Sequence, residues 1–580
     1  MQRRAVLKCA GSWGASVLLR TSGFAWSVSS GNANRLALNQ CGYLQQSDKT
    51  ISVQTEGERD KSFQVVSDQT GHPVFEGQLS DPFVDPASGD SVSLADFSRL
   101  TTPGRYRLVS QGTRSQAFLI GNDVYADPLR LSMRAFYGQR CGCAVDLGDG
   151  YRYTTCHQAE AFHPSSGRTG TLHNHGGWHD AGDYGRYIVN SAITAGTLLW
   201  AWELYPAALH SLSLQIPESG GRLPDYLAEV RWNLEWMLFL QDLDGGVWHK
   251  QTSEQFCGFV MPQNDKLTSY VIGTGVSPYK STCATAGFAA VMAIAARCYG
   301  EYDATFAALC LAAAKRGWSW AIVHPDVGFA NPPGILTGAY GDTQCHDAIL
   351  WASAELWRTT GDRQYEQAFL LAHHSSPAET PITAPSWDKL APLAYWAYVL
   401  TERKADEATR GRILAQTRAG AQILLNRHRS SGYGTTLDTT DYFWGSNSVA
   451  ANQSLLLLIA NHLQPDSHLV EAALGNLHYL LGRNCFGVSW VTHVGSNPFL
   501  HPHHRPSIAD GIVAPWPGLL SGGPNAQPAD KVARTLPKLP PMRMWLDDAM
   551  APSLNEVAIN WNAPLVFLLA GANSRISLIS

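Results

Sequence analysis

Two aspartates lie three positions apart in a segment rich in glycine and aromatic residues, residues 177–187. Asp180 and Asp183 are separated only by Ala181 and Gly182, and a glycine permits the tight bend that would point both carboxylates into one space. The aromatic neighbours are Trp178, Tyr184 and Tyr187. Carboxylates transfer protons and flat rings stack on sugar faces, so the segment indicates carbohydrate chemistry. The alternative interpretation is that one aspartate caps the helix that follows.

A third carboxylate lies far downstream, Glu556 in residues 555–564. Glycoside hydrolysis uses one carboxylate to activate water and a protonated carboxyl to protonate the leaving oxygen, roughly 6.5–9.5 Å apart in inverting enzymes. The apolar neighbours Val557 and Trp561 are expected to raise the pKa of Glu556, as an acid catalyst requires. The alternative is a glutamate that only begins the last helix.

A proline-rich loop, residues 495–507, offers hydrogen-bond donors on a stiff backbone. Its donors include His503 and Arg505, which could hold sugar hydroxyls. The same pattern also fits a rigid surface loop whose polar groups are satisfied locally.

Potential metal ligands precede the aspartate pair. Two thiolates and two imidazoles would make a closed tetrahedral zinc site of the structural kind. Their spacing is irregular, and buried cysteines with independent exposed histidines would give the same pattern. The candidates are Cys141, Cys156, His157, His173, His175 and His179.

Length and composition describe a large, well-packed globular protein. The chain has 580 residues, 45% of them hydrophobic and 16% charged, which predicts two or more domains. The formal net charge of -5 offers no basic surplus for nucleic acid or anionic lipid. The 19 tryptophans fit a long carbohydrate cleft as well as a core.

The N-terminal sequence has the features of a targeting segment. Arg3 and Arg4 precede a weakly apolar run, which resembles a Tat export signal over residues 1–30, with cleavage after Gly23 or Ser27. An ordinary Sec signal is the alternative. No later apolar run reaches the length of a membrane span. We therefore expect a periplasmic or secreted protein.

The 11 cysteines do not form the framework of a small secreted domain. Three of them lie in apolar helical patterns and are predicted to be buried thiols. These are Cys283, Cys298 and Cys310.

Two kinds of periodicity divide the chain. Residues 33–122 contain short runs of β-branched and alternating residues between turn signals, which predicts a β-sandwich of immunoglobulin type. Residues 125–575 have apolar residues at helical spacing, separated by long loops, which predicts an (α/α) barrel with a cleft built by loops at one end. The predicted helices are 193–205, 225–241, 284–299, 304–322, 347–359, 392–401, 411–427, 454–461, 470–481 and 562–570.

Three of the segments above, far apart and in this order, resemble the signature regions of glycoside hydrolase family 9: residues 177–187, 495–505 and 555–563. The Leu-Asn-Gln-Cys-Gly-Tyr run at residues 38–43 resembles the start of the Ig-like domain that precedes the barrel in one subgroup. The resemblance spans residues 35–572. It implies an inverting cellulase with an (α/α)6 barrel.

The resemblance also implies roles. Asp183 would be the general base, Asp180 its partner that holds the water, and Glu556 the general acid. His503 and Arg505 match the family's His-x-Arg substrate-binding pair, and we count His503 with the catalytic group and Arg505 with the substrate-binding residues.

Further site residues follow from their positions. Asp547 matches an acidic position ahead of the acid and is expected to be catalytic. Where the family has an aromatic residue four positions before the acid, this chain has Pro552, which affects the subsite next to the acid. The aromatic side chains beside the carboxylates are expected to bind substrate: Trp178, Tyr184 and Trp561.

The resemblance extends to metals. The subgroup has a zinc site with an Arg-Cys-Gly and a Cys-His element, matched here by residues 140–142 and by Cys156 with His157. We favour His179 as the fourth ligand and leave His173 and His175 open. Calcium is a second expected metal at residues 338–347, although acidic residues are sparse there.

These observations predict a secreted or periplasmic endo-β-1,4-glucanase that acts on β-1,4-glucan as a monomer, without nucleic-acid or membrane partners. The chain ends soon after the last helix, which favours soluble or amorphous glucan over crystalline cellulose. One alternative is an exo-acting cellodextrinase or β-glucosidase of the same family. Another is a glucan-binding protein that has lost catalysis, although all three carboxylates are present.

Overall fold

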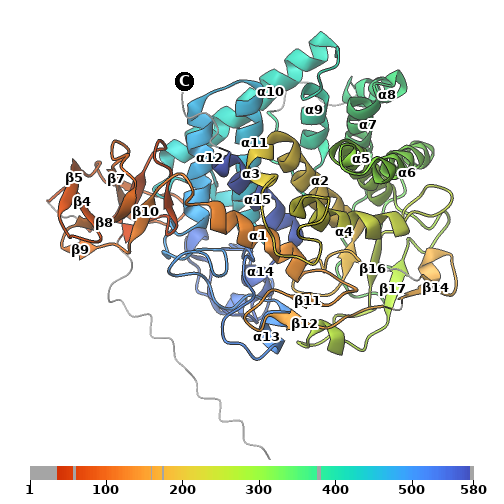
Figure 1. The fold of residues 1–580 in the computed structure, drawn as a ribbon, viewed down its shortest axis with the longest axis horizontal. Coiled ribbons are helices and arrows are strands. Elements are labelled where there is room, and N and C mark those ends of the chain that lie inside the picture. The colour runs from red at the N-terminus through yellow and green to blue at the C-terminus, as the bar shows by residue number, and fades with distance from the viewer. Residues whose placement is uncertain (1–35, 57–59, 159, 173–175, 375–380, 575–580) are drawn as a thin grey trace, which may run out of the picture. The chain divides into compact units, whose positions relative to one another are not determined.

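The structure is a computed structural model that describes residues 36–56, 60–158, 160–172, 176–374 and 381–574 (Figure 1). The segment 1–30, where the sequence predicts an export signal, lies outside the described residues. His173 and His175 also lie outside them. The described chain begins with strands and continues with helices, in the order that the sequence predicts.

The first part of the described chain is a sandwich of two sheets. In β8, side chains alternate between the two faces, and Tyr106 and Leu108 point inward. They join Ile51, Val65 and Phe97 in a separate apolar core, which confirms the predicted Ig-like sandwich. One sheet has the order β1 (Leu36–Ala37), β3 (Thr50–Gln54), β7 (Ser91–Asp96), β6 (Phe83–Val84). The other has the order β2 (Gly42–Tyr43), β10 (Phe118–Ile120), β8 (Gly104–Ser110), β4 (Ser62–Ser67), β5 (Pro73–Gln78), with β9 (Thr113–Arg114) paired to β8.

Helices dominate the rest of the described chain. All ten predicted helices are present, and the structure adds α1 and α8. The longer helices are α1 (Ala126–Gly138), α2 (Ile188–Leu204), α4 (Asp225–Phe239), α5 (Thr282–Tyr299), α6 (Ala304–Val323), α7 (His346–Thr360), α8 (Arg363–His374), α9 (Ala391–Val399), α10 (Glu407–Ser430), α11 (Ser446–Leu463), α12 (Ser467–Leu480) and α15 (Ile559–Asn573). Single turns are α3 (Pro206–Leu209), α13 (Arg505–Ala509) and α14 (Pro552–Asn555), and the 3₁₀ turns are η1 (Pro164–Ser166), η2 (Pro262–Asn264), η3 (Thr439–Asp441), η4 (Ala533–Thr535) and η5 (Pro541–Arg543).

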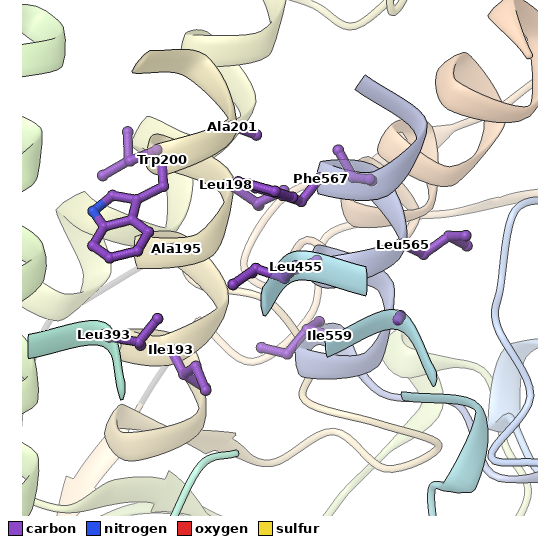
Figure 2. Close-up of a cluster of buried hydrophobic side chains, with 14 of the residues drawn as sticks. Ile193, Ala195, Leu198, Trp200, Ala201, Leu393, Leu455, Ile559, Leu565 and Phe567 are labelled. Carbon is purple, nitrogen blue, oxygen red and sulfur yellow. The ribbon is translucent and has the colours of Figure 1, made fainter. Parts of the chain in front are cut away.

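Six of these helices form the inner ring of the barrel: α2, α5, α7, α9, α11 and α15. Four of them, α2, α5, α9 and α15, are apolar nearly all round, as expected for helices that are covered on every side. Helix α15 packs against α2 and α11, while α2, α5, α7 and α9 pack in succession. In Figure 2, Leu198 of α2, Leu455 of α11 and Phe567 of α15 meet in the core. The remaining long helices pair with these six, which gives the predicted (α/α)6 barrel.

A small sheet, absent from the sequence prediction, lies beside the barrel. Strand β15 leads directly into α2, so the sheet fixes the exit of the 177–187 segment. Its order is β14 (Thr171–Leu172), β13 (Glu160–Phe162), β17 (Ser269–Ile272), β16 (Lys250–Thr252), β15 (Arg186–Tyr187). A separate hairpin joins β11 (Val145–Asp146) to β12 (Arg152–Tyr153).

Helix α5 has the length and apolar composition of a membrane span, but 89% of its 18 residues are buried within the fold. Its position in the inner ring accounts for that composition. Among the described residues, no other helix has both properties.

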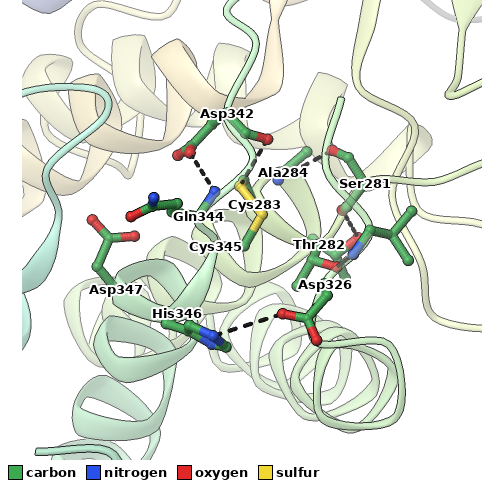
Figure 3. Close-up of a disulfide and its surroundings, with 12 residues drawn as sticks. Ser281, Thr282, Cys283, Ala284, Asp326, Asp342, Gln344, Cys345, His346 and Asp347 are labelled. Atoms are coloured by element: carbon green, nitrogen blue, oxygen red, sulfur yellow. Dashed lines mark hydrogen bonds and ion pairs between the residues drawn. A yellow bond between two sulfur atoms is a disulfide. The ribbon is translucent and has the colours of Figure 1, made fainter. Parts of the chain in front are cut away.

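The prediction of a free thiol at Cys283 is wrong. Cys283, in the first turn of α5, forms a disulfide with Cys345, which immediately precedes α7 (Figure 3). The two cysteines are 62 positions apart, and sequence alone does not pair them. Cys298 and Cys310 are free and buried, as predicted.

Candidate active site

One cleft of about 1090 Å³ collects the three predicted carboxylates from opposite ends of the chain. Its walls come from loops that precede inner helices and from residues of the helices themselves, including α10 and α11. Asp180 and Asp183 precede α2, and Glu556 precedes α15. Other lining residues include Phe256, Tyr340, Trp387, Trp444, His503, Arg505, Pro552 and Trp561.

Backbone contacts bring the three loops together. The Gly182 carbonyl accepts hydrogen bonds from Nη1 of Arg505 at 2.6 Å and from its backbone N–H at 3.2 Å. A Cβ on Gly182 would lie 2.0 Å from the carbonyl oxygen of His503, so only glycine fits between the loops. The His503 N–H donates to the Asn555 carbonyl at 2.8 Å, beside the acid Glu556.

Asp180 is buried, and both of its carboxylate oxygens are engaged. Asn190 donates to Oδ1 and the Tyr340 hydroxyl to Oδ2, each at 2.6 Å. Its backbone carbonyl accepts from the Ile559 N–H at 2.9 Å, which ties it to α15. Burial, followed by the neighbouring Asp183, raises the pKa of Asp180 to about 8. The residue is therefore held in one orientation by donors on three elements.

Asp183 is anchored through one oxygen. Its Oδ2 accepts from the Gly185 N–H at 3.0 Å and from the Tyr187 hydroxyl at 3.2 Å. Oδ1 lies outside these two hydrogen bonds, and the side chain lines the cleft. An anchored carboxylate at a cleft wall has the geometry of a base that takes a proton from water.

Glu556 has the protonation expected of an acid catalyst. Burial raises its pKa to about 8, with further contributions from Asp183 and Asp180. Trp444 donates its indole N–H to Oε2 at 3.0 Å and orients the carboxyl group. The group is therefore protonated at neutral pH, while it lines the same cleft as Asp183.

The His-x-Arg pair lines the cleft as predicted. Nδ1 of His503 faces the Ala549 carbonyl at 2.7 Å, and since a carbonyl only accepts, this nitrogen carries the proton. Arg505 also donates to the Cys257 carbonyl at 3.0 Å through Nη2. Arg505 therefore lines the cleft and also links the loops that carry Gly182 and Cys257.

Asp547 does not have the predicted catalytic position, since it is absent from the cleft wall. Its carboxylate accepts from the backbone N–H groups of Leu500, at 2.8 Å, and His501, at 2.9 Å. Because these residues lead to His503, Asp547 supports the loop that carries it.

The structure places two of the predicted substrate-binding aromatics outside the cleft lining. Trp178 is fully buried and donates to Glu229 at 2.9 Å inside the barrel. Tyr184 donates to the Val260 carbonyl at 2.5 Å and packs against His179. Sequence proximity to the aspartates suggested both, but Trp178 and Tyr184 are absent from the cleft lining, whereas Tyr187 of the same segment lines it. Trp561, the third prediction, does line the cleft.

The cleft contains aromatics that sequence reasoning missed: Tyr340, Trp387, Trp444, Phe443 and Phe256. Tyr340 belongs to residues 338–347, which the sequence assigned only to calcium. The Phe443–Trp444 pair just before a helix is the one local signal that could have been used. No motif marks Trp387 or Phe256.

The four favoured metal ligands meet in one place. One potential ligand atom from each of Cys141, Cys156, His157 and His179 lies within 4.8 Å of the others. Nδ1 of His157 is buried without a hydrogen-bond partner, while Nε2 lies 3.3 Å from Oδ2 of Asp265. A ligating imidazole whose other nitrogen donates to a carboxylate has this arrangement. The donor set therefore fits a tetrahedral zinc ion.

Residues 338–347 form no comparable group of potential ligands within the described chain. Asp342 accepts instead from the Gln344 N–H at 2.9 Å, and Asp347 from the Leu390 N–H at 2.6 Å (Figure 3 shows the first). Asp342 therefore stabilises a local turn and Asp347 a contact with the start of α9, and the calcium prediction gains no support.

Comparison with known proteins agrees with this geometry. Residues 32–115 match the cellulase N-terminal Ig-like domain, and residues 125–569 match glycosyl hydrolase family 9. Endoglucanase D of Acetivibrio thermocellus is 35% identical over 548 residues, covering 93% of this chain and 83% of the relative. A cellodextrinase of Butyrivibrio fibrisolvens is 32% identical, covering 93% and 99%.

Solved structures give the same result. A metagenome-derived glycoside hydrolase family 9 endoglucanase has a TM-score of 0.86 at 37% identity, covering 93% of this chain and 99% of that one. A Zn-binding triple mutant of the family 9 endoglucanase J30 has a TM-score of 0.85 at 36% identity, covering 91% and 99%. The chain therefore belongs to glycosyl hydrolase family 9, among the members that carry an N-terminal Ig-like domain.

Proposed function

We propose that the protein is an endo-β-1,4-glucanase that hydrolyses glucan with inversion at the anomeric carbon. The observation that carries the proposal is the pairing of Asp183 and Glu556 in one cleft. One carboxylate is anchored to accept a proton, and the other has its pKa raised to about 8. Inverting hydrolysis requires these two states at neutral pH.

The reaction follows from these states. Asp183 removes a proton from a water molecule that Asp180 helps to hold, and the water attacks the anomeric carbon. Glu556 donates its proton to the glycosidic oxygen as the bond breaks. The aromatic side chains of the cleft, such as Trp561 and Trp444, offer flat faces for glucose units.

Endo action is supported by relatives named as endoglucanases, whereas the relative named cellodextrinase keeps the exo-acting alternative open. The test measures viscosity and reducing ends together on carboxymethylcellulose. Endo cleavage lowers the viscosity steeply while few reducing ends appear. Reducing ends that accumulate at nearly constant viscosity would indicate exo action, and binding without any release of sugar would indicate a glucan-binding protein.

We also propose that Cys141, Cys156, His157 and His179 hold one structural zinc ion. The J30 variant described as Zn-binding supports this, together with the convergence of the four side chains. His179 directly precedes Asp180, so a metal at this cluster would fix the start of the aspartate loop. The ion would supply cross-linking and no step of the hydrolysis.

Export to the periplasm or the medium is a further part of the proposal. The Arg3-Arg4 pair supports it, and so does the disulfide, because disulfides persist in oxidising compartments. The monomeric state and the absence of membrane and nucleic-acid partners stay predictions.

A further inference from the structure

A buried lysine lies behind the cleft wall. Lys250 is fully buried, at 0% exposure, and is not among the residues that line the cleft. Its Nζ donates to Oδ1 of Asn331 at 2.8 Å, to Oγ1 of Thr337 at 3.2 Å and to the Gly338 carbonyl at 2.7 Å. An ammonium group has three donors and no acceptor, so these partners match it fully. The site therefore offers one acceptor for each donor of the Lys250 ammonium.

The Lys250 ammonium also lies beside Tyr187, the residue that hydrogen-bonds to Asp183. Lys250 and Tyr187 are directly opposite each other in the β15–β16 pair, so their side chains share one face of the sheet. Nζ lies 5.5 Å from the centre of the Tyr187 ring. The Tyr187 hydroxyl in turn donates to Asp183 at 3.2 Å. Removing Lys250 would leave a gap behind this tyrosine.

Lys250 also hydrogen-bonds to the segment 337–340, which contains Tyr340, the residue that hydrogen-bonds to Asp180. Two residues after Gly338, Tyr340 donates its hydroxyl to Asp180 at 2.6 Å. Tyr340 has a φ of 42°, a left-handed conformation that a tyrosine rarely adopts, so its surroundings must impose it. The Tyr187 and Tyr340 rings lie 4.8 Å apart, and a Cβ on Gly338 would be 3.3 Å from the Tyr187 hydroxyl.

We propose that Lys250 is a positioning residue that sets the orientation of both aspartates, acting on Asp183 through Tyr187 and on Asp180 through the 337–340 segment. The inference rests on the proposed hydrolase reaction. Lys250 does not line the cleft, and its three hydrogen bonds go to Asn331, Thr337 and Gly338 and not to a carboxylate, so we assign its effect on orientation to the two tyrosines.

Electrostatics supports the connection. Burial lowers the pKa of Lys250 to about 7, and the Asp183 carboxylate acts against that shift. The charge of Asp183 is therefore felt at Lys250. The adjacent His249 supports the same segment, because its Nε2 lies 3.0 Å from the Ala339 carbonyl.

The test replaces Lys250 by methionine, which keeps the length of the side chain and removes its donors. We expect kcat on cello-oligosaccharides to fall about 10- to 100-fold, because small misplacements of catalytic groups are costly. KM should change less than about threefold, since no substrate contact is lost. Combined with Tyr340→Phe, the loss should be clearly smaller than the product of the single losses, as for residues that act in one chain of contacts.

Lys280→Met is the matched control. Lys280 is also buried, but it pairs with Asp242 at 2.6 Å, and its ammonium lies over the ring of Trp248 instead of Tyr187. This variant should lose thermal stability and keep kcat. Should Lys250→Met fail to fold, Asn331→Ala removes one acceptor of Nζ at a partly exposed position, and should lower kcat several-fold with the same non-additivity.

Each outcome decides between the explanations. If the wild type is active and folded Lys250→Met has the same kcat, the inference is wrong, while the proposed function stands. The same holds for an unchanged kcat in Asn331→Ala when Lys250→Met does not fold. Losses that multiply with that of Tyr340→Phe, or an equal loss of kcat in Lys280→Met, would also overturn it, because they indicate a general structural role. A wild type that releases no sugar from any β-glucan would contradict the proposed function itself.

Discussion

Glu556 keeps its proton near neutral pH because its surroundings penalise the charged form. Burial is the largest cause, and the nearby carboxylates of Asp183 and Asp180 add to it. The apolar neighbours in the sequence predicted the direction of this shift. They did not predict the indole of Trp444 that orients the carboxyl group, because Trp444 is 112 positions away.

Glu556→Gln keeps the shape of the side chain and its contact with Trp444 but has no proton to donate. We expect kcat to fall about 10²–10⁴-fold with oligosaccharide binding retained. In the wild type, the acid is protonated below a pKa of about 8, so kcat/KM should fall as the pH rises through about 8. That alkaline limb should be absent from the residual activity of the variant.

Glu235→Gln is a suitable control, since Glu235 lies on α4 with its side chain 46% exposed and away from the cleft. It should leave both the rate and the pH profile unchanged. A Glu556→Gln enzyme within a few-fold of wild type would show that another group donates the proton.

The sequence predicted the role of a single residue only when that role did not depend on which distant residues lie beside it in the fold. Gly182 had to be a glycine for the reason that the sequence suggested, a tight approach, although the group that it approaches is His503, 321 positions later in the sequence. The sequence did not show that Trp178 and Tyr184 lie outside the cleft lining, because adjacency in sequence does not tell on which side of a bend a ring lies. Only a tertiary structure separates Trp178, in the core, from Trp561, in the cleft.

At the scale of elements, the long helices were predictable and the short strands were not. Apolar residues at helical spacing over 10 to 20 positions give a strong signal, whereas strands of two to four residues, such as β15 and β16, carry almost no pattern. Those strands nevertheless bring Tyr187 and Lys250 together. The elements that position the site were therefore the least visible in the sequence.

The disulfide is an element-scale constraint on the segment that carries Tyr340. It links the start of α5 to the start of α7, with 62 positions between the cysteines. Closing a loop of that size restricts the unfolded chain by about 4 kcal/mol. Cys283→Ala/Cys345→Ala should therefore unfold at a lower denaturant concentration, which chemical denaturation followed by fluorescence would measure.

The same denaturation experiment with added reductant provides the control. Reductant should destabilise the wild type and a Cys298→Ala variant, which keeps the disulfide, but not the double alanine variant. Equal midpoints for the wild type and the double variant without reductant would show that the cross-link contributes nothing.

At the scale of the whole molecule, the order of two domains and the class of the barrel followed from periodicity, and the family followed from three separated motifs. The position of the cleft did not, because its walls come from loops and helices spread over some 380 residues, from Asp180 to Trp561. Loops lack periodic patterns, so their convergence becomes visible only in the fold. The metal cluster was predicted in part. The sequence named its four residues, but their spacing did not show that they lie close together in the fold.

The proposed zinc site is tested on the intact chain. Elemental analysis of purified protein should find about one zinc per molecule, and Cys156→Ser should lose the metal and lower the melting temperature. Cys310→Ser, a buried thiol outside the cluster, should keep the metal. Fully stable protein without metal would contradict the assignment.

The stereochemistry of the first product tests the central claim most directly. If Asp183 activates water on one face of the sugar while Glu556 protonates the oxygen on the other, each β-linkage yields an α-anomer, and no covalent intermediate forms. Proton NMR of cello-oligosaccharide hydrolysis can follow the anomers before mutarotation equilibrates them. The account predicts that the α-anomer signal grows first. A β-anomer that appears first would mean a retaining nucleophile and would contradict the roles given to Asp183 and Glu556.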